Sequence, residues 1–220
     1  MRLFAAVWPP EDVLDHLDLA LASVRGAPSG MLSAVRWSAR ETWHLTVAFY
    51  GELPDGARPG LAADLAQVAA GVEPYELGLR GAGVFSHRTM WVGVAGNLES
   101  QRTVTRGCVE AGEAAGGLVD SRPRERPHLT IGRVPPGSRP TRRGSSRADV
   151  SGLRPDTRMT DEARVAESLV RALAVYEGPR WLVDELLLVS SRPGAGRGGG
   201  PLYERVGTFP LGRQRGTVAG

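Results

Sequence analysis

The chain contains no lysine, because all 27 residues in the Lys+Arg count are arginines. This absence excludes three kinds of chemistry: a P-loop lysine on nucleotide phosphates, a lysine Schiff base, and a nucleotide attached covalently to lysine. The glycine-rich run at 194–200 therefore cannot complete a phosphate-binding P-loop. We interpret this run as a flexible hairpin loop.

Cysteine and long apolar runs are also scarce. Cys108 is the single cysteine, which excludes an internal disulfide, and its apolar neighbours favour a buried, unreactive thiol. No run approaches the roughly 18–20 apolar residues of a membrane span. The first ten residues resemble a strand stopped by two prolines rather than a signal peptide. We therefore expect a cytoplasmic protein with no membrane contact.

The charge of the chain permits a nucleic-acid partner without requiring one. The formal net charge is +3 and the sequence pI is about 9.6. Residues 135–158 are rich in Pro, Gly and Ser and carry six arginines against two acids. This composition is typical of a flexible insert. Either a solvated linker or an electrostatic arm that gathers RNA phosphates would have it.

Alternating strand and helix patterns predict an α+β fold over residues 1–220, as one domain with two similar lobes and a groove between them. Amphipathic spacing predicts a first helix that follows Pro10 and carries Val13, Leu14, Leu17, Leu21 and Val24. The further helices are expected at 61–69, 98–115 and 160–176. The expected strands are 2–8, 43–50, 75–85, 89–94, 127–134, 181–190 and 202–210.

One short phrase occurs twice in the chain. Residues 44–47 read H-L-T-V and residues 128–131 read H-L-T-I, each inside a β-prone run. In a strand, alternate side chains share a face. Each His would then point the same way as its Thr, while the aliphatic residues turn toward a core. On simple alternation the shared face carries His44, Thr46, Ala48 and Tyr50 in one copy, and His128, Thr130 and Gly132 in the other.

These pairs suit acid–base chemistry on a phosphodiester. An imidazole has an ordinary pKa near 6.5 and can give or take a proton at neutral pH. A threonine hydroxyl can donate a hydrogen bond to a phosphoryl oxygen. Two such pairs facing one phosphate would supply a base, an acid and two donors, which suits metal-free cleavage, especially of a cyclic phosphate. No metal-ligand spacing is present.

The chain resembles the two-histidine (2H) phosphoesterases, and among them the LigT-like RNA 2′,3′-cyclic phosphodiesterases, also called the 2′-5′ RNA ligase family. The two H-x-T motifs carry the resemblance. Supporting matches are residues 35–37 (V-R-W), 90–94 (M-W-V-G-V), 188–191 (L-V-S-S) and 201–204 (P-L-Y-E). The resemblance implies a bilobal fold, with antiparallel-rich sheets, helices outside and a central groove.

The resemblance also implies a reaction and roles for individual residues. It implies cofactor-free hydrolysis of an RNA 2′,3′-cyclic phosphate to a 2′-phosphate, with ligation as the reverse step. By family analogy His44 is the proton donor, His128 the proton acceptor, and Thr46 and Thr130 bind phosphoryl oxygens. Arg133 matches a phosphate-binding arginine, although alternation places it on the face opposite His128. We also expect a monomer.

Several alternatives stay open on the sequence alone. The same site would serve a small nucleotide, such as an ADP-ribose cyclic phosphate or a 2′-5′ oligoadenylate. A protein that binds RNA ends without turnover is a third interpretation. Tyr50 and Tyr203 are candidates to stack on a nucleobase. Phe49 is expected in the core, as are the tryptophans Trp37, Trp43, Trp91 and Trp181, and His16 and His87 are expected at the surface.

Overall fold

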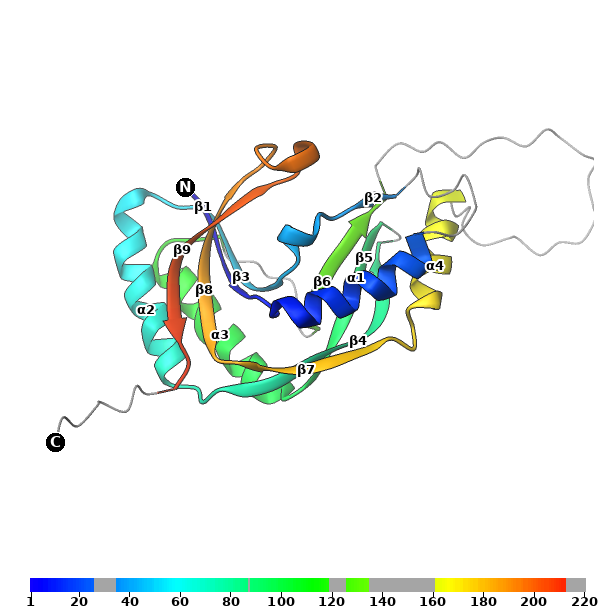
Figure 1. Ribbon diagram of the computed structural model, residues 1–220. Helices are drawn as coiled ribbons and strands as arrows, with labels where there is room; N and C mark the ends of the chain where they lie inside the picture. Colours follow the sequence, from blue (N-terminus) through cyan, green and yellow to red (C-terminus); the bar gives the residue numbers. More distant parts are fainter. Residues whose placement is uncertain (26–34, 87, 119–125, 135–160, 213–220) are drawn as a thin grey trace, which may run out of the picture.

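A single nine-stranded antiparallel sheet organises the chain (Figure 1). The structure is a computed structural model that describes residues 1–25, 35–86, 88–118, 126–134 and 161–212. The strands follow one another in the order β7-β4-β5-β6-β3-β1-β8-β9, and the short β2 pairs with β6. The strands are β1 (Arg2–Val7), β2 (Arg36–Trp37), β3 (Leu45–Glu52), β4 (Tyr75–Phe85), β5 (Thr89–Gly96), β6 (His128–Arg133), β7 (Glu177–Val183), β8 (Glu185–Arg192) and β9 (Leu202–Pro210).

Four α-helices of the described chain pack on the sheet, two against each half. They are α1 (Glu11–Arg25), α2 (Arg58–Ala70), α3 (Leu98–Ala114) and α4 (Asp161–Ala172). Helices α2 and α3 contact each other and the strands β3, β8 and β9, whereas α1 contacts β7, and α4 contacts β4 and β5. Helix α1 follows β1 along the chain but packs on the opposite half of the sheet. The two halves therefore share a continuous core.

Strand β1 is buried on both faces, and its sequence accounts for this. Leu3, Ala5 and Val7 point into the main core, beneath the helices. Phe4 and Ala6 alternate with them and belong to a second apolar cluster, which Leu187 and Val189 of β8 complete. Both faces of this half-sheet are therefore apolar, and the second cluster forms a floor on the face that carries His44.

The predicted α+β fold is confirmed, and so is the first amphipathic helix. In α1 the five residues expected to face the core are all buried, and Glu11 and Asp12 occupy the first turn. Acidic side chains there complement the partial positive charge of a helix N-terminus. The expected burial of Cys108 is also confirmed, because the thiol lies on the buried face of α3.

Two predicted elements near the C-terminus are wrong in their bounds. The apolar run 181–190 is not one strand, because Asp184 separates β7 from β8. The helix expected over 160–176 ends at Ala172, and β7 begins at Glu177. The first error arises because a continuous apolar run does not reveal where the chain changes neighbours in a sheet. The predicted insert at 135–158 lies outside the described residues.

Within the described part of the chain, no helix is both long enough and apolar enough to span a membrane.

Candidate active site

The two H-L-T motifs lie at the starts of the two central strands of the sheet, with His44 immediately before β3 and His128 as the first residue of β6. Strands β3 and β6 are antiparallel, and Leu45 pairs with Leu129. This pair brings the two motifs side by side, since His44 and Thr46 flank Leu45, and His128 and Thr130 flank Leu129. The two imidazoles lie close enough for the charge of His128 to act on His44. The structure thus brings the two histidines together from two distant parts of the chain.

Both imidazoles are oriented by the same local hydrogen bond. Nδ1 of His44 lies 2.7 Å from the carbonyl oxygen of Thr42, and Nδ1 of His128 lies 3.0 Å from that of Arg126. A carbonyl oxygen only accepts, so each Nδ1 carries a proton and donates. In the neutral rings Nε2 then keeps its lone pair. Nε2 of His44 lies 3.0 Å from the hydroxyl of Thr46, within the site.

Aromatic rings enclose His44. Trp8 stacks on the imidazole with ring centroids 4.9 Å apart, Phe4 lies at the same distance, and Tyr203 approaches edge-on at 5.1 Å. The pKa of His44 falls to about 4, chiefly because burial disfavours the charged ring; the hydrogen bond to Thr42 opposes this fall, and the nearby charge of His128 adds to it. The imidazole of His44 is therefore neutral at pH 7 in the ligand-free protein.

A second pair of aromatic residues borders His128. Phe85 meets the imidazole edge-on at 4.9 Å, and Trp91 lies 6.1 Å away and stacks on Phe85. Gly83 makes room for this tryptophan, because a Cβ atom there would lie 2.1 Å from the Trp91 ring. Each histidine thus has its own aromatic surroundings, contributed by strands from its own half of the sheet and, for Trp8, by the turn that follows β1.

A β-bulge at the fourth residue of each motif changes which later side chains face the site. Opposite β1, Thr46 and Ala48 pair with successive residues, so Val47 is an extra residue. Opposite β5, Thr130 and Gly132 pair with successive residues, so Ile131 is extra. A bulge of this kind shifts the alternation of side chains by one position.

The bulge in β6 corrects the expectation for Arg133. Arg133 pairs with Thr89, two residues from Trp91 on β5, and therefore lies on the face of His128 and Thr130. Simple alternation predicted that Arg133 lies on the opposite face, because no local pattern in the sequence indicates the bulge. The positive charge of Arg133 also lowers the pKa of Tyr203, which agrees with a position on the site face.

The bulge in β3 corrects the expectations for Tyr50, Ala48 and Phe49. The interpretation of Tyr50 as a base-stacking residue is wrong. Its side chain lies in the main core, where it is only 1% exposed and packs on Gly112 of α3. Ala48 lies in the same core and leaves no room for a ligand. Phe49, expected in the core, instead packs on the second apolar cluster, with Arg2 over its ring. Gly132, the counterpart of Ala48, also faces core residues.

The other aromatic candidates divide between the site and the core. Tyr203 does reach the site, where burial raises its pKa and the charges of Arg133 and Arg2 lower it. Its hydroxyl is therefore protonated at neutral pH and able to donate. Trp43 and Trp181 are buried core residues as expected, whereas Trp91 is half-buried beside His128.

Three residues of the site were not found from the sequence: Phe4, Trp8 and Phe85. Their contacts with the histidines are long-range, and no local pattern marks them. Of the two histidines expected at the surface, His16 is exposed on α1 and contacts Tyr176, and His87 lies outside the described residues. Among the residues that the structure describes, no three His, Cys, Asp or Glu side chains cluster as metal ligands.

This fold is shared with LigT-type phosphoesterases of known structure. The chain matches the crystal structure of E. coli LigT in its apo form with a TM-score of 0.65 at 20% identity, over 96% of this chain and 97% of that one. It matches the crystal structure of TT0787 of Thermus thermophilus with a TM-score of 0.61 at 24% identity, over 97% and 98% of the two chains.

Sequence comparison identifies the family. The family model described as the 2′-5′ RNA ligase superfamily matches residues 13–142. The chain is 31% identical to an RNA 2′,3′-cyclic phosphodiesterase of Methanothermobacter thermautotrophicus over 144 residues, which is 61% of this chain and 71% of the relative. The chain belongs to the 2′-5′ RNA ligase superfamily.

A second relative is an RNA 2′,3′-cyclic phosphodiesterase of Geobacillus stearothermophilus, 35% identical over 128 residues. The match takes in 55% of this chain. It spans only about two fifths (39%) of the length of that relative.

Proposed function

We propose that this chain hydrolyses the 2′,3′-cyclic phosphate at an RNA end to a 2′-phosphate. The observation that supports this proposal best is the antiparallel Leu45–Leu129 pair between the two H-L-T motifs, together with the nearness of the two imidazoles, since the charge of His128 acts on His44. The names of the two relatives support the same reaction. Bound between the histidines, the phosphate would receive donors from Thr46, Thr130 and Arg133.

The reaction needs one proton taken and one given. Nε2 of His128 takes a proton from water as the water oxygen bonds to phosphorus, and Nε2 of His44 gives a proton to the 3′-oxygen as its bond to phosphorus breaks. This assignment follows the family resemblance. His44 is neutral in the free protein, and a phosphate anion beside its ring raises its pKa toward the protonated form. When the 5′-hydroxyl of a second RNA attacks the phosphorus in place of water, the same step forms a 2′-5′ phosphodiester and releases the 3′-oxygen, which is 2′-5′ ligation.

Positive charge beside the site favours an RNA end over a small nucleotide. Arg36 of β2 and Arg133 of β6 are directly paired across the sheet, and neither makes an ion pair among the described residues. Two like charges held side by side are unfavourable unless an anion joins them. A second phosphate, on the 5′ side of the terminal nucleotide, would fulfil this role.

His44→Ala and His128→Ala test the proposal directly. Each variant should lower kcat/KM on a cyclic-ended oligonucleotide at least about a hundredfold, because each removes a positioned acid or base. The measurement is formation of the 2′-phosphate product, run in EDTA because the proposed mechanism uses no metal. His16→Ala is the matched control, since His16 is exposed on α1. Near-wild-type turnover by both site variants would contradict the mechanism.

A further inference from the structure

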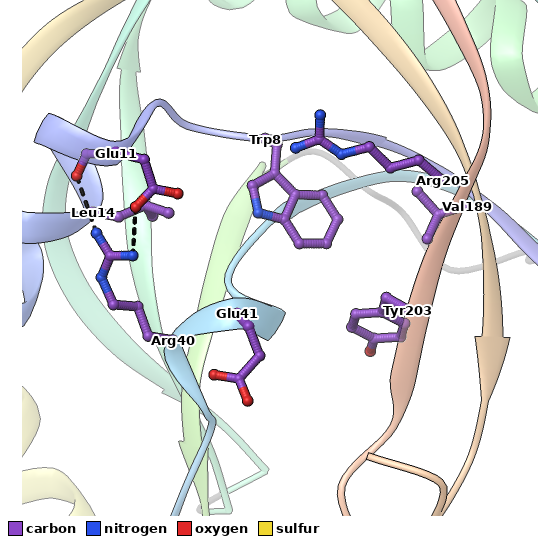
Figure 2. Close-up of a pocket in the computed structure, with 8 residues that line it drawn as sticks. All are labelled: Trp8, Glu11, Leu14, Arg40, Glu41, Val189, Tyr203 and Arg205. Atoms are coloured by element: carbon purple, nitrogen blue, oxygen red, sulfur yellow. Dashed lines mark hydrogen bonds and ion pairs between the residues drawn. The ribbon is translucent and has the colours of Figure 1, made fainter. Parts of the chain in front are cut away.

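A cavity of about 360 Å³ lies among Trp8, Glu41 and Tyr203 (Figure 2). Trp8 and Tyr203, which contact the imidazole, also line this cavity. Small-molecule sites in proteins have volumes of about 300–1,000 Å³, so the cavity has room for one ring system. It is lined by Trp8, Glu11, Leu14, Arg40, Glu41, Val189, Tyr203 and Arg205.

The charges around the cavity balance one another, because Arg205, like Glu41, lines it without an ion pair among the described residues. Arg40 is held by two acids, with Nη1 2.6 Å from Glu11 and Nη2 2.5 Å from Asp15. The guanidinium carbon of Arg205 lies 5.8 Å from the ring centroid of Trp8. Glu41 makes no ion pair among the described residues, and its carboxylate would repel an anion. The cavity instead suits a neutral group that offers hydrogen-bond donors.

The rings and apolar walls of the cavity suit a planar group. The imidazole of His44 stacks on Trp8 and the guanidinium of Arg205 lies over the same ring, so a ligand in the cavity meets the edge of the indole and the ring of Tyr203. Leu14 and Val189 supply apolar walls, and Tyr203 stands across from Glu41 (Figure 2). Stacking of a nucleobase on an aromatic side chain is worth about 1–3 kcal/mol and does not depend on the base. Selection among bases must therefore come from hydrogen bonds.

We infer that this cavity binds the base of the terminal, cyclic-phosphate nucleotide, and that Glu41 makes guanine the preferred base. Guanine alone presents two adjacent donors, N1–H and N2–H, which match the two oxygens of a carboxylate. Adenine and cytosine each present one exocyclic amino group, and uracil presents one ring N–H. The carboxylate of Glu41 thus forms a paired contact with guanine and a weaker one with the other bases.

The location of the cavity agrees with the proposed chemistry, on which this inference rests. In the proposed function, His44 protonates the 3′-oxygen of the terminal ribose. That ribose must then lie against His44, and the base it carries extends past the rings that surround this imidazole. Trp8 and Tyr203 are those rings, and the cavity lies beyond them.

Equilibrium binding tests the inference without any turnover. The full chain is titrated calorimetrically with the 2′-monophosphates of guanosine, adenosine, cytidine and uridine. We expect guanosine 2′-phosphate to bind about tenfold more tightly than the other three. Glu41→Gln should remove this preference. The affinity for guanosine 2′-phosphate should fall about tenfold, and the affinities for the other three nucleotides should not change. Glu204→Gln on β9, a carboxylate paired with Arg192, is the matched control and should keep the preference.

The two proposals fail in different ways. Equal binding of all four nucleotides by the wild type, or an undiminished guanosine preference in Glu41→Gln, would overturn the assignment of the cavity. Turnover of the four 2′,3′-cyclic mononucleotides is measured separately. A guanosine preference in binding without any turnover would support the cavity and overturn the hydrolase. If all four cyclic nucleotides are hydrolysed at one rate and all four 2′-phosphates bind equally, the hydrolase is supported and the assignment of the cavity is overturned.

Discussion

At the scale of single residues, the enclosure of His44 sets the electrostatics of the site. Trp8, Phe4 and Tyr203 remove water from around an imidazole that would otherwise titrate near pH 6.5. Removing water disfavours the charged ring, so the pKa falls to about 4. A bound phosphate reverses this effect, because an anion at Nε2 favours the charged ring. Substrate binding itself thereby prepares the proton donor.

We expect nuclear magnetic resonance to detect this change. In the free protein the imidazole signals of His44, assigned by their loss in His44→Asn, should titrate near pH 4. Between about pH 6.5 and pH 4 the unfolded chain binds a proton at this imidazole and the folded protein does not, so His44 destabilises the fold as the pH falls through this window and adds nothing further below it. Saturation with a nucleotide 2′-phosphate should move the titration to higher pH. A free-protein value near 6.5, or no change on binding, would contradict the assigned environment.

At the scale of secondary-structure elements, paired bulges in β3 and β6 decide the composition of the site. Each motif keeps its His and Thr on one face and then shifts the alternation by one residue at Val47 and Ile131. The shift brings Phe49 and Arg133 to the site face and sends Tyr50 into the core. The same motif thus continues differently in the two strands: β3 adds a ring to the second apolar cluster, and β6 adds a positive charge on the face of His128.

Gly83 of β4 offers a test of how the strands support the site. Gly83→Ala places a Cβ atom into the ring of Trp91, and such overpacking costs about 1–3 kcal/mol of unfolding free energy. Because Trp91 borders His128, turnover should fall as well. The measurements are denaturant unfolding and product formation. Gly56→Ala is the control, because a Cβ there meets nothing within 4 Å. Equal stability of the two variants would contradict this packing.

At the scale of the whole molecule, one strand pairing joins the two halves of the sheet on which the motifs lie. Between β3 and β6, only the Leu45–Leu129 pair is formed among the described residues. Two helices make further connections between the halves. Helix α1 follows β1 in the chain but packs on β7, and α3 follows β5 but packs on β3. The hairpin of β8 and β9 adds a further tie, because Arg36 of β2 donates to the carbonyl of Gly198 at 2.8 Å. The site therefore lies where the halves meet.

We expect the arginine-rich residues 135–158 to strengthen RNA binding through their positive charge. Replacing the six arginines with glutamine keeps the length of residues 135–158 and removes their charge. For single strands, log K changes with log salt by about −0.7 for each neutralised phosphate. We expect a shallower slope for a cyclic-ended oligonucleotide, and unchanged turnover of a cyclic mononucleotide. An unchanged slope would show that the insert is a solvated linker.

Much of the site was predictable because its core is a local pattern. The alternation of His, Leu and Thr marks both strands and the face that each His shares with its Thr, and the α1 residues at helical spacing do face the core. Phe4, Trp8 and Phe85 could not be predicted, since each meets its histidine only through folding. Arg133 and Tyr50 were placed on the wrong faces for a related reason: strict alternation holds only until a bulge interrupts it.

The sequence by itself determined the reactive groups, the strands that bear them and the exclusion of lysine chemistry. These follow from side-chain identity and from periodicities of two and 3.6 residues, which act between neighbours in the chain. Only the tertiary structure decided the low pKa of His44, the face of Arg133 and the cavity beside Trp8. Burial, bulges and cavities depend on which strands pair and which distant rings exclude water, and no local spacing encodes that choice.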